Sequence, residues 1–243
     1  MLDFLYHGLV KKKLELQYKT DLHSHFIPEI DDGCASIEES LMLILQMKKL
    51  GYKKLLTTPH IMHSKYPNTN DIIKNRLFEL RGMLKVKNIN IEVEAAAEYY
   101  CDTHFLELIT KNNLLYFGDK YVLFELSYTK RPKNLEFIIE KLLNKGYKPV
   151  LAHPERYRFL TEVHEYRDLK DLGVLFQLNV NSLGGYYGNQ AQKKALLLAK
   201  KSMVDFIGSD IHNQTHMDHY KMNIAGNHIE MLFRNNRILN DNI

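Results

Sequence analysis

Imidazole and carboxylate side chains recur in four short strings of the sequence, and each string follows an apolar, strand-like run. The strings are DLHSH at residues 21–25, TPH at 58–60, AHPER at 152–156 and SDIH at 209–212. Two further carboxylates, Glu98 and Glu125, lie at the ends of two other such runs. Imidazole and carboxylate are ligands that suit zinc, manganese and iron. Because several strands in turn deliver these groups, the sequence predicts a site for more than one metal ion.

The first and last strings share a spacing that suits metal binding. His23 and His25 are two residues apart, and so are Asp210 and His212. Side chains at positions i and i+2 of a strand lie on the same face, so each pair can bind one ion. The alternative for the first pair is that both histidines lie at the surface. Their position at the end of an apolar strand does not favour that alternative.

Two candidate ligands between these pairs could instead have a purely structural role. Asp32 belongs to the sequence IDDG, which by itself predicts a turn. Its position after the histidine pair makes it a candidate ligand, and we prefer it to Asp31. His60 follows a strand that Pro59 ends, and a purely structural histidine is the alternative there.

The two isolated glutamates differ in how specific their signal is. Glu125 lies in the apolar run YVLFELSY, where an unpaired carboxylate would be costly, so a bridging metal ligand accounts for it. Glu98 is less specific, because Glu92 and Glu94 have the same strand parity and only its position at the strand end favours it.

Arg156 lies three residues after the candidate ligand His153 and places a fixed positive charge beside the predicted site. A phosphoryl transition state requires such a charge. The alternative is a surface salt bridge with Glu155 or with a carboxylate on a helix. The remaining histidines fall outside these patterns, and we expect most of them at the surface: His7, His63, His104, His164, His216, His219 and His228.

Runs rich in β-branched and aromatic residues alternate with helical periodicity along nearly the whole chain. We expect strands near residues 18–26, 54–60, 89–100, 121–128, 148–152, 174–180 and 204–209. We expect helices from the capping box at Ser36 to Gly51, and then at 70–87, 103–112, 132–145, 162–171, 190–201 and 219–233. In this pattern Pro132 suits a first helical turn, and Gly146 and Gly173 suit helix ends.

Roughly seven strand–helix units with short connections predict a parallel α/β barrel, closed or distorted. On this map all the candidate ligands lie at the carboxyl ends of strands. In parallel α/β barrels, that edge is where active sites are built. The chemistry and the topology therefore agree.

The composition describes one globular domain. The 243 residues are 45% hydrophobic and 26% charged, with a net charge of +4 and no clustering of lysines beyond residues 11–13. This pattern excludes a nucleic-acid-binding stripe. The two cysteines, Cys34 and Cys101, are far apart and fit a reducing cytoplasm. Neither has an arginine six residues later, so cysteine-dependent phosphatase chemistry is excluded.

We divide the chain into an N-terminal extension at 1–18, a barrel domain at 19–235 and a polar tail at 236–243. No stretch approaches the ~20 apolar residues that a membrane span needs. Residues 1–10 are apolar but lack the order of a secretory signal, so we expect a helix that packs on the barrel. A peripheral membrane contact through Leu2, Phe4, Leu5 and the following lysines is the alternative.

The chain resembles the polymerase-and-histidinol-phosphatase (PHP) superfamily in a series of motifs that occur in the same order. These motifs are the HxH start, IDDG, TPH, AEYY, the strand glutamate, AHPERY and SDxH. They resemble more closely its bacterial capsular-polysaccharide tyrosine-protein phosphatases of the CpsB/CapC type. The likeness runs from about Thr20 to about His212 and includes LNVNSLGGYYG. It implies a distorted (β/α)7 barrel with two or three divalent ions, most often manganese, with iron or zinc as alternatives. The implied reaction is hydrolysis of phosphotyrosine on a bacterial tyrosine autokinase that controls exopolysaccharide export.

The resemblance also implies a role for each candidate residue. A first ion would be bound by His23, His25, Glu125 and Asp210, and Glu125 would bridge to a second ion bound also by His153. A third ion would be bound by Asp32, His60, Glu98 and His212. Arg156 would contact the phosphate, a hydroxide between the ions would attack phosphorus, and Asp210 or a metal-bound water would carry the proton.

The chain departs from the family pattern in two places. About twenty residues precede the HxH strand, and the stretch after SDxH, residues 213–219, lacks the second phosphate-binding arginine of some relatives. A histidine or a backbone amide would take that role. Two alternatives to protein phosphotyrosine hydrolysis remain: a small-molecule phosphoesterase such as a histidinol-phosphate phosphatase, and a non-catalytic partner of an export kinase.

Overall fold

The computed structural model of the protein describes residues 17–243. The predicted N-terminal helix and the alternative membrane contact lie outside these residues. Within them, no helix has both the length and the apolar character needed to cross a membrane.

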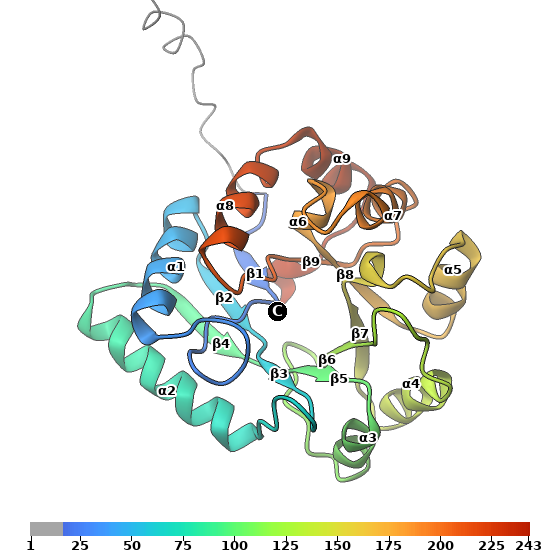
Figure 1. Ribbon diagram of the computed structural model, residues 1–243, viewed down its shortest axis with the longest axis horizontal. Coiled ribbons are helices and arrows are strands. Elements are labelled where there is room, and N and C mark those ends of the chain that lie inside the picture. Colours follow the sequence, from blue (N-terminus) through green and yellow to red (C-terminus); the bar gives the residue numbers. More distant parts are fainter. Residues whose placement is uncertain (1–16) are drawn as a thin grey trace, which may run out of the picture.

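Strands and helices alternate along the chain, as the sequence predicts. The strands are β1 (Thr20–Leu22), β2 (Lys54–Thr57), β3 (His60–Ile61), β4 (Glu92–Ala95), β5 (Glu98–Tyr100), β6 (Tyr121–Glu125), β7 (Lys148–Ala152), β8 (Leu175–Asn179) and β9 (Phe206–Gly208). The helices are α1 (Ile37–Leu50), α2 (Asn70–Val86), α3 (Thr103–Thr110), α4 (Leu135–Asn144), α5 (Val163–Asp171), α6 (Val180–Leu183), α7 (Asn189–Lys200), α8 (Gln214–Asn223) and α9 (Asn227–Asn235). Figure 1 shows the helices outside the strands.

All strand pairs are parallel, and the pairing continues around a ring. One sheet has the order β1-β2-β4 and the other the order β3-β5-β6-β7-β8-β9. The sheets join at one side because β2 continues into β3 and β4 continues into β5. At the other side, Ser24 bridges Ile211, and the amide of Asp210 donates to the carbonyl of His23 at 2.8 Å. The fold is therefore a distorted (β/α)7 barrel with seven strand positions.

Two of the predicted strands are broken, which produces the distortion. The run at 54–60 divides at Thr58 and Pro59, and the run at 89–100 divides at Ala96 and Ala97. Proline lacks the amide hydrogen that a continuous ladder requires. The hydrogen bonds from Ala96 N to Thr57 O and from Glu98 N to Pro59 O carry the pairing across both breaks.

The predicted helix boundaries need three corrections. The single helix expected at 219–233 is two helices, α8 and α9, because the chain turns before Gly226, the N-cap of α9. The helix α4 begins at Leu135, so Pro132 does not lie in its first turn. The short helix α6 was not predicted. Half of the predicted capping box is present: the Ser36 hydroxyl accepts from Glu39 N, but the Glu39 carboxylate accepts from the amide of Ala35 and not from that of the N-cap residue Ser36.

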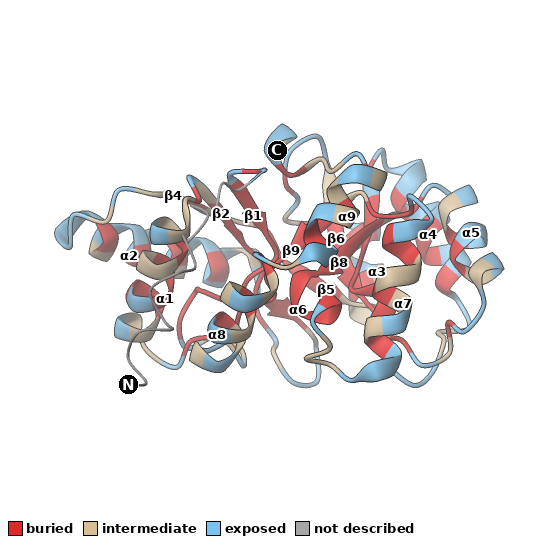
Figure 2. Cartoon of the chain, turned by 90° about the horizontal axis from the view of Figure 1, so that it is seen from above, coloured by how far each residue is buried: buried red, intermediate tan, exposed pale blue. Residues whose placement is uncertain are grey.

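Two apolar clusters support the barrel. The larger one fills the space between the strands and the helices, and the outer helix faces are exposed (Figure 2). The smaller one consists of residues of seven different strands or loops, among them Leu22, Leu123, Val150 and Phe206.

Because β1 and β9 must approach closely to close the ring, Gly208 has no room for a side chain. A Cβ there would lie 2.3 Å from the carbonyl oxygen of Leu22 and 2.6 Å from Nε2 of Gln177.

We expect Gly208→Ala to lower the free energy of unfolding by about 1–3 kcal/mol, because overpacking a filled site forces the backbone to move. The matched control is Gly82→Ala in α2, where a Cβ would meet nothing within 4 Å. That change should raise stability by ~0.5–1 kcal/mol, since alanine favours the helix. Equal denaturation midpoints for the two variants would show that the β1–β9 contact is not tight.

Candidate metal centre

The predicted ligands meet at one end of the barrel, where the strands end. A pocket of about 350 Å³ opens there, and its walls include Asp32, His60, Glu98, His153 and Asp210. His23 and His25 lie beneath it and are fully buried. The structure therefore brings together the nine residues that the sequence nominated as ligands: His23, His25, Asp32, His60, Glu98, Glu125, His153, Asp210 and His212.

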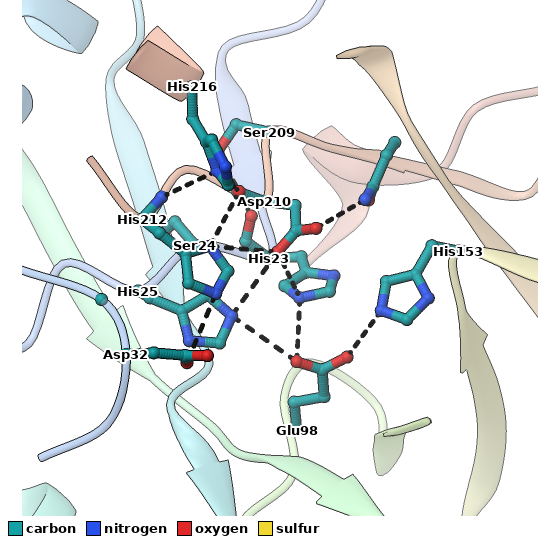
Figure 3. A network of polar contacts seen from close by, with 12 residues as sticks. His23, Ser24, His25, Asp32, Glu98, His153, Ser209, Asp210, His212 and His216 are labelled. Atoms are coloured by element: carbon teal, nitrogen blue, oxygen red, sulfur yellow. Dashed lines mark hydrogen bonds and ion pairs between the residues drawn. The ribbon is translucent and has the colours of Figure 1, made fainter. Parts of the chain in front are cut away.

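Glu98 contacts more imidazoles than any other carboxylate of this cluster, and Figure 3 shows its contacts with His23, His25 and His153. Its Oε1 is 3.0 Å from Nε2 of His153, and its Oε2 is 3.1 Å from Nε2 of His23. The same Oε2 lies 3.2 Å from Nδ1 of His60 and 3.5 Å from Nε2 of His25. A carboxylate that reaches four imidazoles from two oxygens has the geometry of a bridging ligand.

The predicted grouping of the ligands gave the bridging position to Glu125, whereas in this structure Glu98 contacts more of the imidazoles. Glu125 instead contacts His60, at 3.2 Å from Oε1 to Nδ1, and forms a group with His60 and Glu98. The register explains the difference: Glu98 pairs with Leu123 across β5 and β6, whereas Glu125 pairs with Tyr100. Glu98 is therefore the deeper of the two carboxylates by two residues.

Asp210 presents its two oxygens to different groups. Oδ1 lies 3.3 Å from Nε2 of His23 and 3.5 Å from Nδ1 of His212. Oδ2 accepts hydrogen bonds from Asn179 at 2.6 Å, from Arg156 at 3.1 Å and from Tyr187 at 3.2 Å. Although burial opposes ionisation, the charges of His23, His212 and Arg156 hold the pKa of this carboxyl far below its usual value.

A second group of potential ligands lies nearer the surface. Oδ1 of Asp32 is 3.4 Å from Nε2 of His60 and 3.6 Å from Nε2 of His212. The ring of His212 stacks on that of His25 with centroids 3.9 Å apart. Each of these residues offers one potential ligand atom, and the four atoms lie within 4.8 Å of one another: His25, Asp32, His60 and His212.

The donor set fits divalent metal ions. Two buried imidazole nitrogens near carboxylates, Nε2 of His25 and Nδ1 of His60, have no hydrogen-bond partner. Buried polar atoms are normally satisfied, so unpartnered nitrogens beside carboxylates suggest a cation. Nitrogen and oxygen ligands without thiolate suit manganese, iron or zinc.

Two side chains that sequence reasoning missed hold the histidines in place. Asp31 lies with Oδ2 2.7 Å from Nδ1 of His25, and Gln177 lies with Oε1 2.7 Å from Nδ1 of His23. Such outer contacts fix the orientation of a ligating ring. Asp31 also accepts from the amide of His60. The IDDG turn therefore supplies two functional carboxylates, where the sequence identified only Asp32.

The charges of the cluster compensate one another. Burial disfavours the imidazolium form of His23, but the carboxylates of Glu98 and Asp210 outweigh this effect and raise its pKa to about 9. For His25 the same balance, with Asp31 as the main carboxylate, raises the pKa to about 10. A metal cation bound beside these carboxylates would displace the added proton from each ring, since ligating imidazole must be neutral.

Three of the site residues have a strained backbone. His23, His153 and Asp210 have φ angles of 79°, 35° and 50°, in the left-handed region. Each such non-glycine residue costs on the order of 1–3 kcal/mol, and residues of this kind concentrate at functional sites. All three residues belong to the candidate ligand cluster, and no sequence pattern predicts their backbone conformation.

Arg156 is held between two aromatic rings. Its guanidinium carbon lies 4.6 Å from the ring centroid of Tyr128 and 4.1 Å from that of Tyr187. It pairs with Asp210 and not with Glu155, so the alternative of a surface salt bridge with that glutamate is wrong. Neither tyrosine was predicted to have a role, although Tyr128 belongs to the run YVLFELSY and Tyr187 to the string LNVNSLGGYYG.

One histidine that we expected at the surface belongs to the pocket. His216 is half-buried, lines the pocket beside Asn213, and has Nδ1 3.0 Å from the carbonyl oxygen of Asp210. It lies in the first turn of α8, within the stretch 213–219 that follows the SDIH string. Its spacing from His212 was the available signal.

Comparisons with known proteins agree with this geometry. Tyrosine-protein phosphatase YwqE of Bacillus subtilis is 29% identical over 195 residues, which cover 79% of this chain and 77% of YwqE. A crystal structure from work on YwqE and on CpsB of Streptococcus pneumoniae, described as unique metal-dependent tyrosine phosphatases, matches with a TM-score of 0.74. That match has 27% identity and covers 90% of this chain and 96% of the other.

More distant structures share the fold alone. A lactonase of Listeria monocytogenes, Lmo2620, matches with a TM-score of 0.54 at 10% identity, over 94% of each chain.

The family described as "Capsular polysaccharide synthesis, CpsB/CapC" matches residues 19–238, which is most of the chain. The protein therefore belongs to the CpsB/CapC family.

Proposed function

We propose that this protein is a metal-dependent tyrosine-protein phosphatase, a hydrolase of phosphoric monoesters. The observation that carries this proposal is the sharing of Asp210 between the ligand cluster and Arg156 within one pocket. A cluster of metal ligands next to a fixed guanidinium suits a phosphoryl group. The names of its relatives point to the same reaction.

We propose two or three divalent ions, with manganese as the first choice. His23, His25, Asp210 and Glu98 would bind one ion, and Glu98 would bridge towards His153. The groups formed by His60 with Glu125 and by His25, His60 and His212 with Asp32 would bind the others. Such ions supply Lewis acidity and lower the pKa of water.

The residues of the chain itself prepare the phosphate site. Tyr128 and Tyr187 fix the plane of the Arg156 guanidinium, and Asp210 anchors one of its nitrogens. The remaining N–H groups of Arg156 can donate to phosphate oxygens, where charge develops in the transition state. We keep Asp210 as a proposed proton carrier for the tyrosine leaving group, since its Oδ2 lies in the same pocket as the guanidinium of Arg156.

The proposed substrate is a phosphotyrosine-containing protein, with the tail of a bacterial tyrosine kinase of capsule synthesis as the partner. This would place the protein in the cytoplasm, a reducing compartment in which its two buried cysteines would remain free thiols. The rings of Tyr128 and Tyr187 line the pocket and can contact a tyrosyl ring. A small-molecule phosphoesterase is not favoured, because the curated relatives are named as tyrosine-protein phosphatases.

The function is tested by assaying the manganese-loaded protein on a phosphotyrosine peptide and on a panel of phosphorylated metabolites that includes histidinol phosphate. We expect kcat/KM to be highest for the peptide. Chelation should abolish the activity, and manganese should restore it. Higher kcat/KM for a metabolite would favour the small-molecule alternative, and full activity in metal-free protein would exclude the proposed mechanism.

Glu98→Gln and Glu125→Gln form a matched pair for the ligand assignment. Because Glu98 contacts four imidazoles and Glu125 only one, Glu98→Gln should retain fewer ions per chain. Elemental analysis after gel filtration measures this directly. Metal content that falls more for Glu125→Gln would restore the sequence-based assignment.

Arg156→Ala should lower kcat/KM on a phosphotyrosine peptide by roughly 100- to 1,000-fold, or ~2.7–4 kcal/mol, the effect of removing one preorganised donor. Arg156→Lys should recover only part of this loss, since it restores the charge but not the fork of donors. Metal content should stay unchanged in both variants, because guanidinium is not a ligand. Wild-type kinetics in both would leave phosphate binding to the ions alone.

Neither cysteine should take part in the reaction. Burial raises the pKa of both the Cys34 and the Cys101 thiol to about 12, so each stays protonated near neutral pH. In the unfolded chain these thiols lose their protons near pH ~8.5, whereas in the folded protein they keep them. Their contribution to the free energy of unfolding is therefore present below that pH and is lost as the pH rises above it. Iodoacetamide at pH 8 should label the unfolded protein quickly and the folded protein slowly. Rapid labelling of the folded protein with loss of turnover would contradict this.

A further inference from the structure

A second pocket, with a volume of about 620 Å³, adjoins the candidate metal centre. Tyr128, Arg156 and Tyr187 line both pockets, so the stacked guanidinium forms a wall between them. None of the predicted metal ligands lines the second pocket. Its position implies that a molecule bound at Arg156 from the metal side continues into this space.

The second pocket is built to receive an anion. Gly188, Asn189, Gln190 and Ala191 line it, and they are the N-cap and the first turn of α7. No side chain caps this helix, so the first-turn amides keep their partial positive charge. Arg158 and Lys194 add two cationic groups. Among residues 17–243, no carboxylate forms an ion pair with the exposed Arg158 side chain.

An occupant of this pocket would be a peptide, because the pocket adjoins the site at Arg156 where a phosphoryl group would bind. The carboxyl of Glu155 also lines the pocket, but it is only 1% exposed, and its Oε1 accepts from the Ser182 hydroxyl and from the amide of Asn179. Burial raises the pKa of this carboxyl. Because the side chain of Arg158 is exposed and that of Glu155 is not, a bound anion meets Arg158.

We propose that this pocket binds an anionic side chain that flanks the phosphotyrosine in the substrate, with Arg158 as the residue that selects it. The inference rests on the proposed phosphatase function and deepens it. An extended peptide advances about 3.3 Å per residue, so a side chain roughly two or three positions from the phosphotyrosine can pass the width of the Arg156 wall. The anion can be a carboxylate or a second phosphate.

The experiment compares three kinds of phosphotyrosine peptide and one small substrate, para-nitrophenyl phosphate. The first peptide has alanine around the phosphotyrosine, and the second has glutamate scanned over the four positions on each side. The third has the non-hydrolysable phosphonomethylphenylalanine at the best of these positions. Each is assayed with the manganese-loaded wild type, Arg158→Ala, Arg158→Glu and the control Arg237→Ala. Arg237 is also an exposed arginine but lines neither pocket.

We expect the wild type and Arg237→Ala to show a KM roughly fivefold lower for the best glutamate peptide than for the alanine peptide, the upper end for an exposed ion pair. Arg158→Ala should lose this preference, and Arg158→Glu should reverse it. About 0.5 M salt should remove it in the wild type. A larger preference for the phosphonate peptide than for glutamate would identify phosphate as the preferred anion.

Hydrolysis of para-nitrophenyl phosphate should be the same in all four proteins. The inference is overturned if Arg158→Ala keeps the wild-type preference, if all substrates weaken equally, or if the wild type has no preference. In each of those cases the wild type still hydrolyses the alanine peptide, so the proposed function stands. Failure of the wild type on every phosphotyrosine peptide would instead overturn both.

Discussion

The structure depends on the mutual compensation of buried charges at the carboxyl end of the barrel. Glu98 and Asp210 are buried carboxylates, and an isolated buried charge of this kind would destabilise the fold by several kcal/mol. Four imidazoles surround Glu98, and three donors satisfy Oδ2 of Asp210. The compensation requires that strands from opposite sides of the ring end at the same level, and closing the ring between β1 and β9 achieves this.

Asp210 couples the two parts of the site. One of its oxygens faces the histidines and the other binds the guanidinium of Arg156, so the positions of the phosphate site and of the ligand cluster are fixed relative to each other. The aromatic rings on both faces of Arg156 restrict it further. A guanidinium held in this way loses little side-chain entropy when it binds a phosphate, which is the advantage of a preorganised donor.

The same wall separates two pockets of different chemistry. The pocket on one side of Arg156 contains the potential metal ligands, whereas the pocket on the other contains the start of α7, Arg158 and Lys194. A phosphotyrosine by itself would use only the first pocket. A peptide would use both, so this division gives the fold a physical means to distinguish a protein substrate from a small phosphate ester.

The sequence by itself determined the alternation of strands and helices and the set of candidate ligands. Apolar periodicity encodes a strand locally, and imidazole and carboxylate at the end of each strand retain their chemistry in any fold. Only the tertiary structure decided which carboxylate is central, because the depth of Glu98 relative to Glu125 depends on the register of β5 against β6. It also decided the roles of Asp31, Tyr128 and Tyr187, whose partners lie on other elements. Such contacts, like the left-handed backbone at His23, His153 and Asp210, arise only when the ring closes, since no neighbour in sequence specifies them.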